Sequence, residues 1–97
     1  MSVTVLLELN VKPEHVEGIK QTFKAILPDT RAYDGCLGVE VTQNQDDANN
    51  IILVERWETR QHYEKYLAWR QETGVLDELG KVVASAPSIR YFDPVDA

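Results

Sequence analysis

Apolar and polar residues alternate along residues 3–11 and 37–42 of this 97-residue chain, which is the spacing of strands with one buried face. The predicted strands cover residues 3–11, 37–42, 51–57 and 88–92. The third stretch carries apolar residues on both faces. We therefore expect it to be a central strand of a covered sheet.

Apolar residues recur at every third or fourth position in the segments between these strands, as they do in amphipathic helices. The first helix is expected to begin at Lys12-Pro13-Glu14, because proline suits the first turn. Pro28 lies late in this helix and predicts a kink or a break. Thr59 is expected to cap a second helix, which Gly74 interrupts before a shorter helix continues.

The resulting order is β-α-β-β-α-β, which predicts an α+β ferredoxin-like fold in one domain over residues 1–97. Such a fold has four antiparallel strands with the helices on one face. The other face also carries apolar side chains and needs a cover. In a chain of this size we expect that cover to be a second copy, and so a homodimer.

Composition removes several classes of function. Ten basic residues against sixteen acidic ones give a net charge of -6, which disfavours nucleic acid and anionic membranes as partners. One cysteine and two histidines allow neither a disulfide nor a thiolate or histidine-rich metal site. An Asp/Glu/His site stays open, although no spacing motif indicates one. No segment resembles a membrane span or a signal peptide, so we expect a cytoplasmic protein.

No phosphate-binding loop, dinucleotide fingerprint or nucleophile elbow is present, so we expect no cofactor. The third predicted strand is more informative, because Leu53, Glu55 and Trp57 share one of its faces. A carboxylate between two large apolar side chains either pairs with a cation or borders a pocket. Candidate cations for Glu55 are Arg90, Arg70 and Arg31. Trp57 itself is either core or pocket wall.

Tyr63, Tyr66 and Arg70 fall on one face of the second helix, with Trp69 alongside. Aromatic rings with polar tips can frame a flat aromatic ligand while a hydroxyl orients it. The alternative is a helix packed on the sheet with its hydroxyls at the rim. His62 points away from this face and is expected to be exposed to solvent.

Several short motifs occur together in a recognisable order. They are Val-Lys-Pro-Glu at 11–14, Asp-Gly-Cys-Leu at 34–37, Glu-Arg-Trp-Glu-Thr at 55–59 and Pro87 before the last strand. In this order the chain resembles the antibiotic biosynthesis monooxygenase family over residues 2–93. The third motif matches the E-x-W-x-S/T signature of that family.

The resemblance implies a dimeric α+β barrel with a pocket between sheet and helices in each subunit. Some members oxidise polycyclic phenols to quinones with molecular oxygen and no metal or flavin, whereas relatives degrade haem, isomerise or only bind small molecules. In this pattern Trp57 lines the pocket and Tyr63 positions the phenol. Leu53 stands where quinone-forming members have asparagine, and Tyr66 and Gln71 stand where many members have histidine.

The hypothesis that follows is a cofactor-independent monooxygenase acting on an electron-rich phenol or hydroquinone. Trp57 would form the pocket wall, Tyr63 or Tyr66 would hold the hydroxyl, and Arg70 would stabilise the anion. The predicted substrate contacts are Glu55, Leu53, Trp69, Arg70 and Asn10. The alternative is a non-catalytic barrel that binds an aromatic metabolite, and a third possibility is an isomerase or haem-handling relative.

Overall fold

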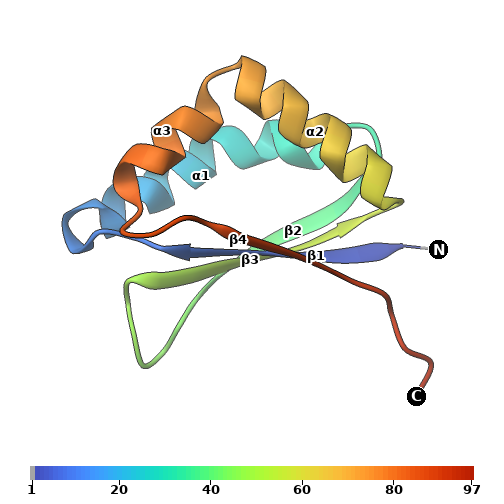
Figure 1. Cartoon of the computed structure of the whole chain (residues 1–97), viewed down its shortest axis with the longest axis horizontal. Helices are drawn as coiled ribbons and strands as arrows, with labels where there is room; N and C mark the ends of the chain where they lie inside the picture. The colour runs from blue at the N-terminus through green and yellow to red at the C-terminus, as the bar shows by residue number, and fades with distance from the viewer. Residues whose placement is uncertain (1) are drawn as a thin grey trace.

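A four-stranded antiparallel sheet carries three helices on one face in the computed structural model, which describes residues 2–97 (Figure 1). The elements are β1 (Val3–Asn10), a 3-10 turn η1 (Pro13–His15), α1 (Val16–Arg31), β2 (Cys36–Gln43), β3 (Asn50–Trp57), α2 (Arg60–Glu72), α3 (Val75–Val82) and β4 (Ser88–Phe92). The strand order is β2-β3-β1-β4. The predicted α+β ferredoxin-like fold is confirmed.

The two inner strands, β3 and β1, place their buried side chains toward the helices. Val5 is paired with Glu55, and Glu55 is paired in turn with Val39 on β2. Side chains alternate along each strand, so one register brings Val3, Val5 and Leu9 of β1 to the same buried face. The prediction of a central third strand is therefore confirmed.

The first helix departs from prediction at Pro28. Helix α1 does not break there but continues to Arg31. Pro28 lies in the last turn, where a missing N–H costs a single internal hydrogen bond. The carbonyl of Pro28 still accepts a hydrogen bond from the backbone N–H of Ala32 at 3.1 Å, so the helix ends normally just beyond the proline.

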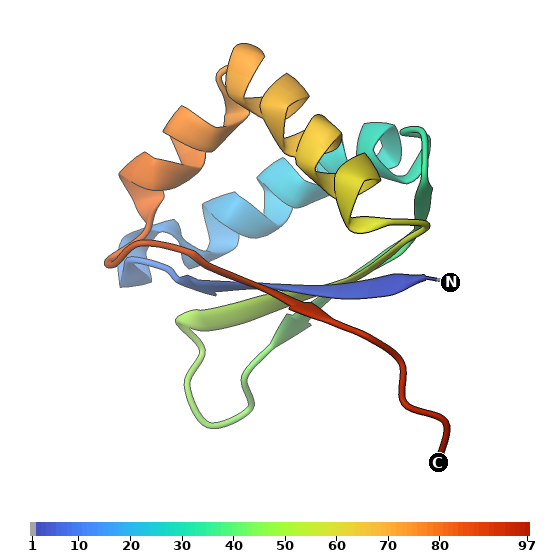
Figure 2. The same cartoon turned by 45° about the vertical axis from the view of Figure 1, so that its right-hand side comes forward.

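Helix α2 begins as predicted. The Thr59 side chain accepts a hydrogen bond from the backbone N–H of His62 at 3.1 Å and so caps the first turn. Gly74 separates α2 from α3 with a φ of 84°, a left-handed conformation that favours glycine. Together α2 and α3 form a bent pair over the sheet (Figure 2).

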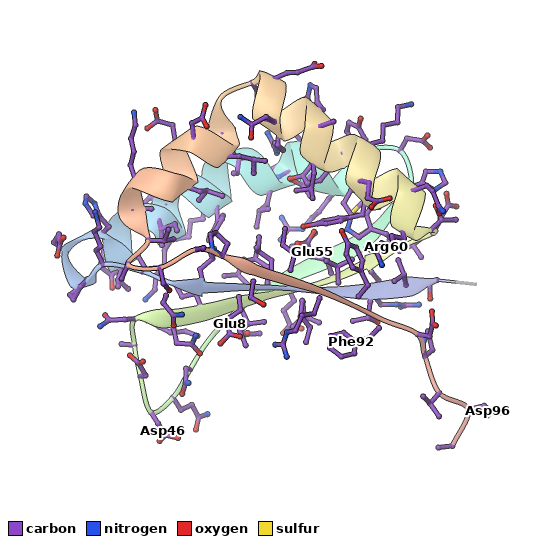
Figure 3. All side chains as sticks on the ribbon, in the orientation of Figure 1. Glu8, Asp46, Glu55, Arg60, Phe92 and Asp96 are labelled. Carbon is purple, nitrogen blue, oxygen red and sulfur yellow. The ribbon has the colours of Figure 1, made fainter. Side chains whose placement is uncertain are left out.

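The opposite face of the sheet has no helix over it among residues 2–97 (Figures 1 and 2). Glu8 and Phe92 lie on this side, whereas Glu55 lies on the helix side (Figure 3). No helix in the described part of the chain is both long and apolar enough to span a membrane. The side chain of Glu55 lies in the layer between sheet and helices.

Candidate functional site

Strand β3 supplies one wall of an internal site. Leu53, Glu55 and Trp57 all face the helices, as predicted, and are only 3%, 3% and 0% exposed. A glutamate this deeply buried is unusual because removing a carboxylate from water is costly. Glu55 is thus the first residue of the site that needs a physical explanation.

The Glu55 carboxylate has one hydrogen-bond partner among the described residues, the indole of Trp57. The indole Nε1–H of Trp57 donates to Glu55 Oε1 at 3.2 Å. Burial raises the pKa of Glu55 to about 7, although the hydrogen bond from Trp57 lowers it in part. Near neutral pH the protonated and the ionised form of the Glu55 carboxyl group are therefore both populated.

The predicted ion pair between Glu55 and an arginine is wrong. Arg90 points to the opposite face of the sheet, where it pairs with Glu8 at 3.4 Å. Arg31 lies at the exposed end of α1 and donates to the Val39 carbonyl at 3.2 Å. The register of the strands and the end of the helix keep both cations away from Glu55. The third candidate, Arg70, has other partners, described next.

Helix α2 supplies the facing wall, and Tyr63, Tyr66 and Arg70 are all buried on its inner side. The Tyr66 hydroxyl lies 2.7 Å from Thr30 Oγ1 and accepts a hydrogen bond from Arg70 Nε at 2.9 Å. Arg70 Nη2 also donates to Thr30 Oγ1 and to the Ile26 carbonyl, each at 2.8 Å. Arg70 therefore joins α2 to α1. The prediction that these hydroxyls lie at a rim is wrong, because both tyrosines are buried.

Tyr63 differs from its neighbour Tyr66 in its hydrogen bonding. Its side chain is 1% exposed, and its hydroxyl is the one buried side-chain polar atom without a partner in residues 2–97. Burial raises the pKa of Tyr63 well above that of an ordinary phenol, and the nearby Glu55 charge raises it further. An unpaired buried hydroxyl is costly, which points to a ligand group or water as its missing partner.

A small cavity of about 30 Å³ lies between these two walls. Its lining combines apolar side chains of β1, α1 and α3 with Leu53, Glu55, Tyr63, Tyr66, Leu67 and Arg70. This volume suits one water-sized molecule. Two larger hollows of about 420 and 460 Å³ flank α1 at the surface, and neither includes a predicted site residue.

Aromatic rings extend this wall toward the start of β2. The Trp57 ring lies 5.5 Å from that of Tyr63 and 5.0 Å from that of Tyr66. Tyr33, which precedes β2, stacks on Trp69 at 5.2 Å with an interplanar angle of 27°. We call these five residues the aromatic cluster. It surrounds Trp57 with other rings on the helix side.

The comparisons with known proteins agree with this architecture. The profile of the antibiotic biosynthesis monooxygenase family matches residues 2–77. The chain belongs to this family. No curated protein sequence matches it significantly.

Solved structures with the same fold cover almost the whole chain. Rv0793 from Mycobacterium tuberculosis superposes with a TM-score of 0.86 at 18% identity and covers 100% of this chain and 98% of its own. A candidate antibiotic biosynthesis monooxygenase from Deinococcus radiodurans gives 0.84 at 23% identity, over 98% and 94% of the two chains. A conserved protein from Methanosarcina mazei Go1 gives 0.86 at 17% identity, over 95% and 91%. At these identities the likeness establishes the fold.

The structure gives a physical role to each position of the family's E-x-W-x-S/T signature. Glu55 accepts the hydrogen bond of the Trp57 indole, and Thr59 caps α2 and fixes where that helix begins. The signature therefore spans the connection from the end of β3, which forms one wall of the site, to the start of α2, which forms the other. Tyr63, one turn into α2, then lies against Trp57.

Sequence reasoning also misplaced one residue and missed two. Asn10 pairs with Asn50 at the far end of β1, whereas the opposite end of the strand pairs with Trp57, so the structure does not bring Asn10 into the site. Thr30 and Tyr33 were not predicted. Thr30 continues the apolar spacing of α1, and a polar residue at such a position could have indicated a buried hydrogen bond.

Proposed function

We propose that this member of the antibiotic biosynthesis monooxygenase family oxidises a small, electron-rich phenol or hydroquinone with molecular oxygen and without a cofactor. One observation carries the proposal: Glu55, with its buried carboxylate, and Tyr63, with its unpaired hydroxyl, line the same largely apolar cavity next to Trp57. A phenol bound there would have both a proton acceptor and a hydrogen-bond donor.

Glu55 is proposed as the base that accepts the phenol proton. A carboxylate whose pKa is about 7 is a stronger base than an ordinary glutamate, which narrows the gap to a phenol with a pKa of about 10. The Trp57 indole holds one oxygen of this carboxylate. The second oxygen has no hydrogen bond with another described residue and remains available to a ligand.

The proposed reaction needs only the phenol and oxygen. Glu55 takes the O–H proton, and the phenolate transfers one electron to oxygen to give a phenoxyl radical and superoxide. Their recombination forms a C–O bond, and loss of water from the protonated hydroperoxide leaves a quinone. Overall, one phenol with a free ring C–H and one oxygen molecule give one quinone and one water, and the carboxylate is regenerated.

The other residues orient the ring and exclude water. Tyr63 would donate its unpaired hydroxyl to the developing phenolate, and Leu53 forms an apolar wall. Trp57 does not line the cavity itself, and it would act by holding Glu55 and packing against Tyr63. Arg70 uses its donors on Tyr66, Thr30 and Ile26, so we assign it to positioning Tyr66 rather than to direct contact with the anion. Trp69, stacked on Tyr33, would close the outer end of the wall.

The cavity must widen to admit a phenol, because ligand pockets are typically about 300–1,000 Å³ and this one is about 30 Å³. The bent pair α2–α3 is the element best placed to move. It is joined at Gly74, and its inner faces line the cavity. Displacement of this pair would open the site along α1, and its return would exclude water during the reaction.

A second candidate is a barrel that binds an aromatic metabolite without changing it. The observation that favours it is Leu53, whose apolar side chain lines the cavity where quinone-forming members of the family have asparagine. Such a protein would still use the Tyr63 hydroxyl and Glu55 to hold a ligand hydroxyl. It would lack turnover.

Oxygen consumption with anthrone and with a hydroquinone distinguishes the two candidates. The monooxygenase predicts oxygen uptake above the buffer rate, together with the product's quinone spectrum, and a large loss of both in Trp57→Phe and Tyr63→Phe. Glu14→Gln, an exposed change in η1, is the matched control and should keep full activity. Ligand-dependent quenching of tryptophan fluorescence without oxygen uptake would support the binding protein instead.

We also propose that the protein is a homodimer that covers the bare face of the sheet. Leu6, Val54 and Phe92 lie on that face and are partly or fully exposed in the single chain. A sheet face of this kind is normally covered in a stable protein. A second copy would cover it by the same residues on both sides.

A further inference from the structure

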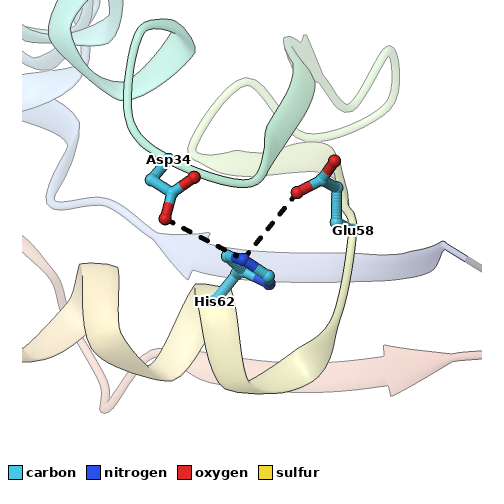
Figure 4. A group of neighbouring side chains, drawn as sticks. All are labelled: Asp34, Glu58 and His62. Atoms are coloured by element: carbon cyan, nitrogen blue, oxygen red, sulfur yellow. Dashed lines mark ion pairs between the residues drawn. The ribbon is translucent and has the colours of Figure 1, made fainter.

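Three side chains that can ligate metals converge outside the cavity, where the turn before β2, the end of β3 and the first turn of α2 meet. They are Asp34, Glu58 and His62, and their ligand atoms all lie within 4.8 Å of one another (Figure 4). We propose that they form a binding site for a divalent transition-metal ion, with Zn²⁺ as the expected occupant. One imidazole nitrogen and two carboxylate oxygens are a donor set that suits this ion.

The distances fit a single ion without movement of the backbone. His62 Nε2 lies 3.7 Å from Glu58 Oε2 and 3.9 Å from Asp34 Oδ2. Zinc binds such donors at about 2.0–2.2 Å, so two donors of one tetrahedral ion lie about 3.4 Å apart. Small rotations of the two exposed carboxylates would close the difference. Three protein ligands would leave a fourth position for water.

His62 is the fixed member of the site. Its Nδ1 lies 2.6 Å from the Thr59 hydroxyl, which also accepts the backbone N–H of His62. When Nδ1–H donates to this hydroxyl, the lone pair of Nε2 faces the two carboxylates, as in metal-bound histidines. The ring also packs against Gly35, where a Cβ atom would lie only 2.4 Å from His62 Cγ. The imidazole is therefore oriented before any ion binds.

The charges at the site also favour a cation. In residues 2–97, neither Asp34 nor Glu58 has an ion pair with a lysine or arginine, and their one ion-pair partner is His62. The cluster holds two carboxylates and one imidazole, so its acidic groups outnumber its basic ones. A divalent ion would balance both carboxylates at once.

A metal ion bound at this site would restrain the segments that carry the aromatic cluster. Each ligand is adjacent in sequence to one ring of that cluster: Tyr33, Trp57 and Tyr63. A bound ion would tie the turn before β2 and the end of β3 to the start of α2. It would stabilise the folded chain, because the three ligands come together only when these elements are in place.

The test is calorimetric titration of ZnCl₂ into EDTA-treated, tag-free protein, paired with thermal unfolding. One ion per chain is expected, with a rise in melting temperature. His62→Ala and Glu58→Gln should each weaken binding by at least about tenfold. His15→Ala is the matched control, since His15 is the other histidine of the chain and lies outside the cluster, and its binding should equal that of wild type.

Co²⁺ gives a second measurement that does not depend on stability. A visible d–d spectrum is expected in wild type and in His15→Ala, and its loss in Glu58→Gln, an exposed change that leaves the core intact. The proposal is overturned if Zn²⁺ does not bind saturably, or if His15→Ala weakens binding as much as His62→Ala does. Several ions per chain with no change in melting temperature would equally overturn it.

Discussion

Two tyrosines one turn apart on α2 illustrate how differently buried hydroxyls can be treated. The Tyr66 hydroxyl has two partners, Thr30 and Arg70, whereas the Tyr63 hydroxyl has none. The first is part of what holds α2 to α1. The unpaired Tyr63 hydroxyl instead lowers the stability of the fold, and we propose that its role is to bind a ligand.

The two hydroxyls should therefore respond oppositely to removal. Tyr63→Phe is expected to raise the free energy of unfolding by about 1–3 kcal/mol, because it deletes an unpaired buried group. Tyr66→Phe is expected to lower it by about 1–3 kcal/mol, because Arg70 Nε loses its acceptor. Urea unfolding of both variants measures the difference. Equal effects, or a marked loss of stability in Tyr63→Phe, would contradict the assignment.

Glu55 should make stability depend on pH in an unusual direction. The folded protein binds the Glu55 proton more tightly than the unfolded chain does, since the pKa rises from 4.5 to about 7. This contribution is fully present below pH 4.5 and is lost as pH rises through 7, and it amounts to about 3 kcal/mol. Glu55→Gln, which keeps the acceptor for Trp57 but cannot ionise, should therefore gain stability over wild type as pH increases.

The measurement is the difference in unfolding free energy between wild type and Glu55→Gln, taken near pH 4.5 and again above pH 7. Comparing the two proteins cancels the titration of all other carboxyl groups. Glu14→Gln, an exposed change in η1, serves as control and should show a difference that hardly varies with pH. A constant difference for Glu55→Gln would mean that this carboxyl is not buried as the structure has it.

At the scale of elements, the turns before β2 and α3 can be compared directly. Gly35 and Gly74 both have left-handed φ angles, 88° and 84°. A Cβ at Gly74 would meet no atom within 4 Å, whereas at Gly35 it would collide with the His62 ring. The turn before β2 is therefore shaped by the side chain packed on it, and not only by its backbone.

Gly74→Ala is expected to lower the free energy of unfolding by the backbone cost alone, about 1–2 kcal/mol, and so to lower the melting temperature. Gly35→Ala should cost clearly more, because the His62 ring must also move. Thermal unfolding of the two variants, without added metal, checks this. Equal losses would show that the His62 ring does not pack on the turn.

The elements themselves follow closely from the sequence, for reasons that are local. The apolar residues on both faces of 51–57 and the Thr59 cap are patterns of near neighbours. The central strand and the helix start that they predict are confirmed. The partners of the buried polar groups do not follow in this way. Arg90 faces away from Glu55 because of the β1–β4 register, and Thr30 meets Tyr66 across 36 residues of sequence. Neither fact is visible in a local pattern.

At the scale of the whole molecule, the bare face of the sheet is the main feature that a single chain does not explain. Val54 is paired with Leu6 at its centre. In the proposed homodimer these side chains would be buried against a second copy. The two faces of the sheet would therefore have different roles. The bare face would bind a second copy, whereas Glu55 and the cavity lie on the helix side (Figure 3).

Val54→Lys should convert the dimer to a monomer, because it would bury a charge in the interface without a partner. Native mass spectrometry at micromolar concentration gives the readout, with circular dichroism to confirm that the variant folds. Ala68→Lys, an exposed change on α2, is the control and should remain dimeric. A monomeric wild-type protein would refute the proposed dimer.

The central claim is that Glu55 accepts a proton from a phenol bound beside Tyr63. Its most direct test is the pH dependence of kcat/KM for oxygen consumption, from about pH 5 to about pH 9, in wild type and Glu55→Gln. We predict a wild-type rate that rises with pH and levels off above about 7, the pKa of Glu55. Glu55→Gln should be about 10²–10⁴ slower and lack this inflection. The same profile in both proteins would contradict the claim.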